Sequence, residues 1–256
     1  MKTPAAALAA ALLLPAVAAA SELPAGDCFK PAPRTDLSQC DLSHRKLAGR
    51  DLTGVRLAGA KLDNADLSRA KLVGADFSGS SAKWVNFTGA DARQANFRKA
   101  DLFHATFDDA NLEDAQLQES YLFGANLINT RAVRADFSGA YLKDILMEGI
   151  DLSGGSIRGC YAFRGVFTDG KMVGTDLSGA DLTGAAMEQV DFTGARLKTT
   201  KLLGATLRRA VFEKADLEGA DFANADVWSA NFSHTLHRPQ SADDALIELF
   251  VVRERR

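Results

Sequence analysis

The sequence is poor in the residues from which most catalytic and metal sites are built. Its 256 residues include only three cysteines, four histidines, three tyrosines and two tryptophans, and no two cysteines stand in a CxxC spacing. That spacing is typical of zinc and thiol-redox sites, so neither is expected. The sequence also lacks a net positive charge, because its formal net charge is −3. A general nucleic-acid binder needs a basic surface, so this function is not expected either.

Long hydrophobic runs are lacking except at the N-terminus. There, one basic residue is followed by an apolar stretch and a run of small residues that includes Ala18-x-Ala20, which is the pattern of a cleavable export signal. The stretch is short for a transmembrane helix and no second one follows, although an N-terminal anchor helix is the alternative. We therefore expect residues 1–20 to be a signal peptide. The mature protein would then be periplasmic or secreted, without stable membrane insertion.

The three cysteines fit an oxidising compartment. Cys28 and Cys40 lie twelve residues apart near the mature N-terminus, and a disulfide between them would tie down the entry segment. Two buried free thiols are the alternative. Cys160 falls at a position that the repeat described next turns inward, which predicts an unreactive thiol in the core.

What the chain has in abundance is a period of five residues. From Leu37 to Phe232 every fifth residue is apolar, through forty consecutive units between Thr35 and His234. The residue two places before each large apolar one is usually alanine or another small residue. The residue just before it is often Asp or Asn, and the two after it are commonly Ser or Thr and then Gly. The segments "ADFSG" at 75–79 and "ADLTG" at 180–184 show the whole unit.

Neither regular secondary structure accepts this period. Steps of five turn a side chain by about 140° around an α-helix, and an odd step in a straight strand alternates between the two faces. The chain must therefore bend once in each unit, with the small and the large residue pointing inward and the other three outward. Such a chain buries a continuous core only by stacking its coils, as solenoids do.

The unit A-[D/N]-[L/F]-[S/T]-G resembles that of the pentapeptide-repeat family, over about four-fifths of the chain. The resemblance implies an all-β solenoid, namely a right-handed quadrilateral parallel β-helix of about ten coils with four units per coil. One coil supports four units: its large residues Phe77 and Phe87 and its small residues Ala82 and Ala92 would alternate around the core. That alternation keeps the core volume constant, as close packing requires.

The ends of such a solenoid need covers, because an open end exposes unpaired backbone groups and core side chains. We assign residues 21–34 to an N-terminal cap that precedes the β-helix of residues 35–234. In this cap Phe29 is predicted to act as a plug, held in place by Cys28.

Residues 235–256 are predicted to form a C-terminal capping helix with Ser241 as its N-cap. Ile247 and Val251 fall outside its apolar face, which leaves a homodimer contact open. The residues of the apolar face, which would seal the last coil, are Ala242, Ala245, Leu246, Leu249 and Phe250.

Any function must lie on the outward positions, and one group of these is rich in aromatic residues. The three tyrosines occupy the same outward position in successive coils, about 4.8 Å apart, with phenylalanines two residues away. A patch of this size is uncommon on a solitary soluble protein, and Tyr and Phe are typical interface anchors. We expect it to bind a partner protein or a second copy of the chain; a stack that only stabilises the fold is the alternative. The predicted binding residues are Phe103, Tyr121, Phe123, Tyr141, Tyr161 and Phe163. On the adjoining side, the patch is widened by Ile128, Leu146 and Val166.

Other functions fit the sequence less well. Acidic residues gather between Asp108 and Glu119, but basic residues flank them, which is typical of a solvated surface. Some pentapeptide-repeat proteins are quinolone-resistance factors whose acidic rods resemble DNA and inhibit gyrase; here basic residues interrupt the outward aspartates. The histidines show no pattern of nucleophile and base, so no enzyme, cofactor or metal site is expected. The sequence thus favours an exported, non-enzymatic, rigid protein-binding scaffold, with a homo-oligomeric rod as the alternative.

Overall fold

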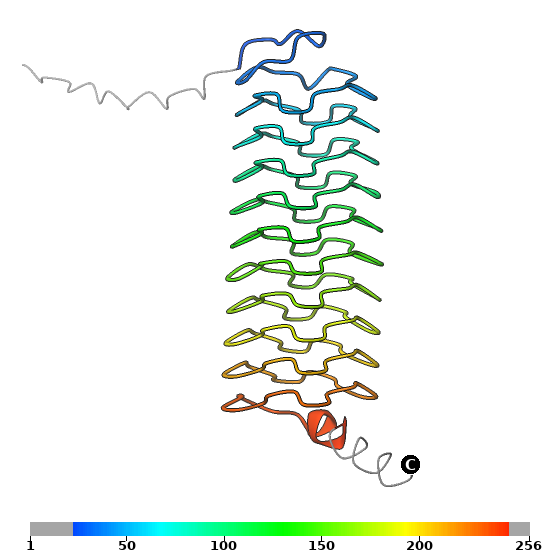
Figure 1. Ribbon diagram of the computed structural model, residues 1–256, viewed down its shortest axis with the longest axis vertical. Coiled ribbons are helices and arrows are strands. Elements are labelled where there is room, and N and C mark those ends of the chain that lie inside the picture. Colours follow the sequence, from blue (N-terminus) through cyan, green and yellow to red (C-terminus); the bar gives the residue numbers. More distant parts are fainter. Residues whose placement is uncertain (1–22, 246–256) are drawn as a thin grey trace, which may run out of the picture.

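The structure is a computed structural model that describes residues 23–245. The chain winds into a long rod of stacked coils, as Figure 1 shows. One parallel bridge occurs in each five-residue unit and joins it to the unit twenty residues later, so that four units complete a coil. This register runs from Asp36↔Arg56 to Asp216↔Leu236. Each strand is reduced to a single bridge, and one short helix, at 240–245, follows the coils in the described part of the chain.

The backbone hydrogen bonds show why a unit of five residues is self-consistent. The N–H of the large residue and the N–H two places later donate to carbonyls nineteen positions further on, and the N–H before the large residue donates to a carbonyl twenty-one positions back. The N–H of the small residue closes a turn onto the preceding large residue. The fifth N–H donates to the Asp or Asn side chain, as from Ser78 to Asp76 Oδ1 at 3.0 Å. This last bond is the reason why Asp or Asn so often precedes the large residue.

The residue two places after the large one turns each corner. From residue 44 to residue 234, every residue at this position has a positive φ. Gly79 illustrates why glycine is common there, because it has a φ of +61° and open space where a Cβ would lie. At Gly79, glycine is therefore favoured for its backbone freedom and not for lack of room.

The inward residues form one continuous core from Leu37 to Ala245, as the period predicts. Phe77 and Phe87 meet edge to face with ring centroids 5.6 Å apart, which confirms that the large residues of this coil face each other. Phe77 also stacks on Phe97 of the next coil at 4.8 Å. The core is thus packed both across each coil and along the rod.

Ser80 is the exception in this core. Its hydroxyl is the one buried side-chain polar atom of residues 23–245 without a hydrogen-bond partner. Ser120, at the same inward position two coils later, donates its hydroxyl to the Leu117 carbonyl at 2.6 Å. We expect Ser80→Ala to raise the free energy of unfolding by about 1 kcal/mol, because it removes an unsatisfied buried group.

Urea denaturation followed by circular dichroism measures this change, with Ser120→Ala as the matched control. The control removes a hydrogen bond that is made, so it should leave stability unchanged or lower it. A loss of stability in Ser80→Ala equal to that in Ser120→Ala would show that the Ser80 hydroxyl is satisfied after all.

The N-terminal end is held by the predicted disulfide. Cys28 and Cys40 are bonded, and the Arg45 guanidinium donates to the carbonyl oxygens of Cys28 and Phe29 at 3.1 and 2.9 Å. The segment before the disulfide pairs with the first coil, because the N–H of Gly26 donates to the carbonyl of Asp36 at 2.9 Å. Residues 24–30 are therefore fixed across the end of the rod.

Phe29 does not act as the plug that we predicted from the sequence. Its side chain is 82% exposed, because its N–H donates to Asp27 Oδ1 in a tight turn at 2.8 Å that leaves the ring in solvent. Backbone covers the core instead: a Cβ added to Gly26 would lie 2.4 Å from Leu37 Cδ2. The N-terminal cover is thus a glycine laid directly on the first core leucine.

The C-terminal helix begins two residues earlier than predicted, at residue 240, so Ser241 lies inside it and is not its N-cap. The Ser241 hydroxyl instead accepts the N–H of Phe222 at 3.1 Å and donates to the carbonyl of Ala220 at 3.4 Å. In the preceding coils, the corresponding N–H and carbonyl groups bond to the backbone of the next coil. Here no further coil follows, and the Ser241 hydroxyl takes the place of that backbone. Ala242 and Ala245 are buried against the core.

Several predictions fall outside the described residues. They are the signal peptide of residues 1–20, the first two residues of the N-terminal cap, and the part of the capping helix from Leu246 onward. Within residues 23–245, the structure contains no helix of the length and hydrophobicity needed to cross a membrane.

Candidate protein-binding surface

The structure brings the predicted aromatic residues together on one side of the rod. We call this the aromatic side and define it as the outward residues of 101–104, 121–124, 141–144 and 161–164. The ring of Tyr141 lies 5.1 Å from that of Tyr121 and 5.3 Å from that of Tyr161. Phe103 and Phe123 stack in a second column at 5.7 Å. The columns join where Phe123 approaches Tyr121 and Tyr141, at 6.5 Å from each.

Sequence reasoning missed Trp84, which extends this surface by one coil, and His104, on which it stacks. Trp84 is 53% exposed, stacks on the imidazole of His104 at 4.3 Å and meets Phe103 edge to face at 5.4 Å. The sequence does indicate this contact, because Trp84 and His104 are twenty residues apart and are therefore neighbours in successive coils. The aromatic surface thus begins at Trp84 and extends to Phe163.

The rings are stacked on one another along the rod, and this decides what they present to solvent. Tyr121 and Tyr141 are within 19° of parallel, and Phe103 and Phe123 within 8°. Rings that stack on successive coils turn their faces toward each other and their edges outward. Tyr121 and Tyr161 remain 41% and 38% exposed, so the surface offers a ridge of aromatic edges to a partner.

Two cations lie over the faces of phenylalanine rings on this side. Lys143 Nζ lies 5.7 Å from the centre of the Phe123 ring, and the Arg164 guanidinium lies 5.5 Å from that of Phe163. Arg164 also pairs with Asp144 at 2.7 Å, so its charge is already balanced. These contacts restrain the rings at the corner of the coil.

The next side of each coil continues the apolar surface around that corner. Leu146 is 37% exposed and is bridged to Val166 in the following coil. Ile128 lies on the same side, where its N–H donates to Asp108 Oδ1 at 2.9 Å. The three residues that the sequence placed on the adjoining side are therefore outward and half-buried or exposed, as predicted.

The acidic stretch between Asp108 and Glu119 is divided among different sides of the coil. Arg134 donates to Glu113 and to Asp114, at 2.7 Å in each case, and these bonds hold the pKa of both carboxyl groups below the ordinary range. Arg131 adds a second contact to Glu113 at 3.3 Å. The flanking arginines thus balance this part of the stretch, as predicted.

Cys160 is a free, buried thiol. Burial raises its pKa to about 12, and its Sγ donates to the Phe137 carbonyl at 2.8 Å. A thiol in this state contains very little thiolate at neutral pH, which is the form that reacts. This residue therefore belongs to the core, as its place in the repeat predicts.

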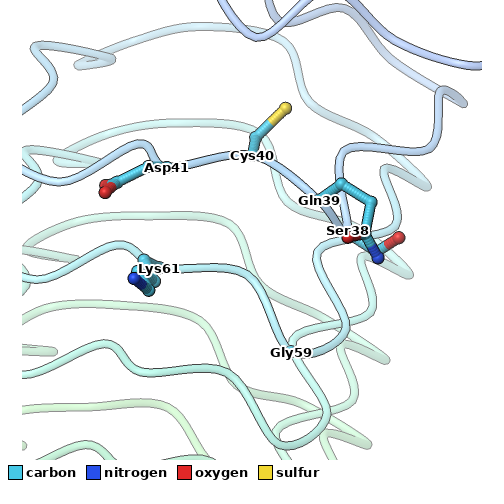
Figure 2. A pocket seen from close by; sticks show the side chains of 6 residues that line it. All are labelled: Ser38, Gln39, Cys40, Asp41, Gly59 and Lys61. Atoms are coloured by element: carbon cyan, nitrogen blue, oxygen red, sulfur yellow. The ribbon is translucent and has the colours of Figure 1, made fainter.

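Small depressions on the described surface include two of about 220 Å³ each. Figure 2 shows the first, where Asp41 and Lys61 lie next to each other on successive coils and the sulfur of Cys40 points away from them. The second lies at the other end of the rod, beside Arg209 and Trp228. Ligand pockets usually measure about 300–1,000 Å³, so neither depression resembles an enclosed active site.

Three potential metal ligands meet near the C-terminal end of the rod, namely Asp216, Glu218 and His237. The Lys198 ammonium lies 2.8 Å from Glu218 Oε2 and 3.3 Å from Asp216 Oδ2, and His237 Nδ1 lies 2.9 Å from Asp216 Oδ1. Lys198 also holds the pKa of Glu218 below its ordinary range. The Lys198 ammonium thus already balances these carboxylates, and we interpret the group as an ion-pair network at the surface.

A comparison with protein families agrees with the repeat. A family model described as pentapeptide repeats matches the chain in eight copies and implies a right-handed β-helix solenoid. The matched residues, in partly overlapping ranges, include 40–79, 51–89, 83–118, 115–154, 166–198 and 200–236. Among solved structures, the chain is similar to HetL, a pentapeptide repeat protein involved in heterocyst differentiation regulation from the cyanobacterium Nostoc sp. strain PCC 7120. The two are 26% identical over 77% of this chain and 91% of HetL, with a TM-score of 0.46. A trypsin-treated form of QnrB1, a plasmid-mediated fluoroquinolone resistance protein, is 22% identical over 80% of this chain and 95% of its own, with a TM-score of 0.41. None of the curated proteins matches the chain.

Proposed function

Because this chain belongs to the pentapeptide-repeat family, we propose that it is an exported, rigid, non-enzymatic scaffold that binds a partner protein through its aromatic side. The rod would consist of about ten coils, closed by the Cys28–Cys40 segment at one end and by the helix at 240–245 at the other. A flat, preorganised rod loses little entropy when a partner binds, so a few anchoring side chains suffice for affinity.

The observation that carries this proposal is the clustering of the outward aromatic residues. Within the repeat of residues 35–234, every outward Phe and Tyr lies on the aromatic side. Of the two tryptophans, Trp84 lies one coil earlier on the same side of the rod, and Trp228 lies on a different side. The backbone does not demand them, because Ser81, Asp101 and Lys201 take the place of the tyrosines in other coils of the same column. The fold requires no particular residue type at this position, yet three successive coils have tyrosine there, a residue type that is typical of protein interfaces.

Export is supported by the N-terminal sequence and by the disulfide. A cleavable signal is the expected reading of residues 1–20. The bond between Cys28 and Cys40 is of a kind that persists in periplasmic and secreted proteins and is rare in the cytosol. We therefore propose a periplasmic or secreted location.

A DNA-mimicking role is not favoured. Outward aspartates are neutralised by cations of neighbouring coils at both ends of the rod, as in Arg56–Asp36 at 3.6 Å, Arg196–Asp176 at 3.7 Å and Lys201–Asp181 at 3.5 Å. A mimic of the DNA backbone needs an uninterrupted run of negative charge along the rod.

The test is an affinity pull-down from native periplasmic extract with the mature protein and a Tyr121→Ser, Tyr141→Ser, Tyr161→Ser variant as baits. We expect one protein to be captured by the parent and lost by the variant, because the variant removes the ring edges that a partner would cover.

Both baits must first show the same thermal melt by circular dichroism, so that unfolding does not explain the loss. If the variant melts normally and both baits retain the same proteins, the aromatic side is a structural stack and the proposal is wrong. If the protein lost is a second copy of the chain itself, the aromatic side is the self-association surface of a homo-oligomeric rod.

A further inference from the structure

The side of the rod that adjoins the aromatic side carries acidic groups without basic partners. We call it the acidic side and define it as the outward residues of 106–109, 126–129, 146–149 and 166–169. Its four charged residues are all acidic: Asp108, Asp109, Glu148 and Asp169. Over the same coils, the other sides carry charges of both signs, for example Arg134 with Asp114 and Arg164 with Asp144.

These four carboxylates make no ion pair within residues 23–245. Asp109, Glu148 and Asp169 are exposed. Asp169 accepts the side-chain amide of Gln189 at 2.8 Å, and Asp108 accepts the N–H of Ile128; both donors are neutral. The negative charge of this side is therefore available to a partner.

Acidic and apolar groups alternate on this surface. Leu146 precedes Glu148 by two residues, and Val166 and Asp169 follow in the next coil. Leu146 comes five residues after Tyr141, so the apolar patch continues around the corner from the aromatic side. A partner that covers the tyrosines on one side meets carboxylates and aliphatic groups on the other.

From this placement we propose that the segment bound at the aromatic side is a basic, amphipathic protein segment. Its large apolar side chains cover the tyrosines and Leu146, and its Lys or Arg side chains face Asp109, Glu148 and Asp169. The inference rests on the proposed function, because it names the chemistry of the partner at that same surface. Nucleic acids and anionic membranes carry negative charge, so the acidic side repels both and favours a protein.

The matched variants follow from the geometry. Asp109→Asn, Glu148→Gln, Asp169→Asn removes three exposed charges from the acidic side, and it spares Asp108, whose carboxylate accepts a backbone N–H. Asn also suits the positive φ of positions 109 and 169. The control is Glu119→Gln, Glu213→Gln, Glu218→Gln, which changes the net charge by the same amount on other sides of the rod.

The probe is a short fluorescein-labelled peptide of alternating lysine and leucine, with a glutamate and leucine peptide as its counterpart, and binding is followed by fluorescence anisotropy. We expect the lysine peptide to bind the parent and the control equally. It should bind about tenfold more weakly to the acidic-side variant and to the tyrosine variant described above. The difference between the control and the acidic-side variant should disappear at about 1 M salt, where charges are screened within about 3 Å.

Three results would overturn the inference: no binding of the lysine peptide to the parent, equal binding of both peptides, or equal affinity of the acidic-side variant and the control. The pull-down separates this failure from that of the proposed function. If a partner from the extract is lost by the tyrosine variant and kept by the acidic-side variant, the aromatic side binds a protein but the basic chemistry is wrong. Circular dichroism melts of all four proteins exclude unfolding as the cause.

Discussion

Replacement of Phe97 by alanine is expected to lower the free energy of unfolding by about 4 kcal/mol. The Phe97 side chain is fully buried. It stacks on Phe77 at 4.8 Å and meets Phe87 and Phe107 edge to face at 5.6 and 5.5 Å. Its removal leaves a cavity beside these three rings that cannot collapse fully, because each coil is held by its bridges to the coils on both sides.

Phe97→Leu is the matched control, since leucine is the usual residue at this inward position, and it should cost only about 1 kcal/mol. Urea denaturation measures both changes. Trp84, which lies against Phe103 and His104 one coil away, reports local loosening by its fluorescence when Trp228 is replaced by Phe. A cost for Phe97→Ala no greater than that of Phe97→Leu would contradict the packing described above.

Loss of the disulfide is expected to have the second largest effect. A Cys28→Ser, Cys40→Ser variant should be less stable than the parent by about 3 kcal/mol, because the cross-link limits the freedom of the unfolded chain. The bond joins residues separated by twelve positions, and it fixes the segment that lays Gly26 on Leu37. Without it, the first coil should open before the remainder of the rod.

The parent protein treated with dithiothreitol provides an independent control, and it should match the double-serine variant. Cys160→Ala under the same reductant should behave as the parent does, because Cys160 is free and buried. The measurement is the midpoint of thermal unfolding, together with mass spectrometry of alkylated cysteines. An unchanged midpoint after complete reduction would show that the disulfide does not support the N-terminal end.

The repeat was predictable from the sequence because a single constraint recurs through forty units. The inward positions follow once every fifth residue is seen to be apolar, and the stacking of the tyrosines follows from the four units per coil that the family resemblance implies. The ends were less predictable, because each occurs once and no period describes it. Phe29 looked like a plug on hydrophobicity alone, whereas the turn made by Asp27 directs it into solvent. Likewise, Ser241 has the composition of a helix cap and instead pairs with the last coil.

The binding surface was predicted in part. Tyrosines twenty residues apart were sufficient to locate the aromatic side. Trp84 and His104 were missed because they occupy the corner position, where glycine is common and many other residue types also occur. The acidic side was also missed, because the sequence suggests only that Asp108 and Asp109 belong with Glu113 and Asp114. In the coil these pairs face different sides, and only the second pair meets arginines.

The register of twenty residues also determines how insertions and deletions affect the fold and the surface of this protein. Loss of one five-residue unit would keep every inward residue inward, so the chain would still wind into a rod. All residues beyond the deletion would, however, move by one side, and a surface built from several coils would be split between two faces. Loss or duplication of twenty residues would only shorten or lengthen the rod. The fold therefore tolerates changes in multiples of five, whereas a binding surface that spans coils is inherited intact only in multiples of twenty.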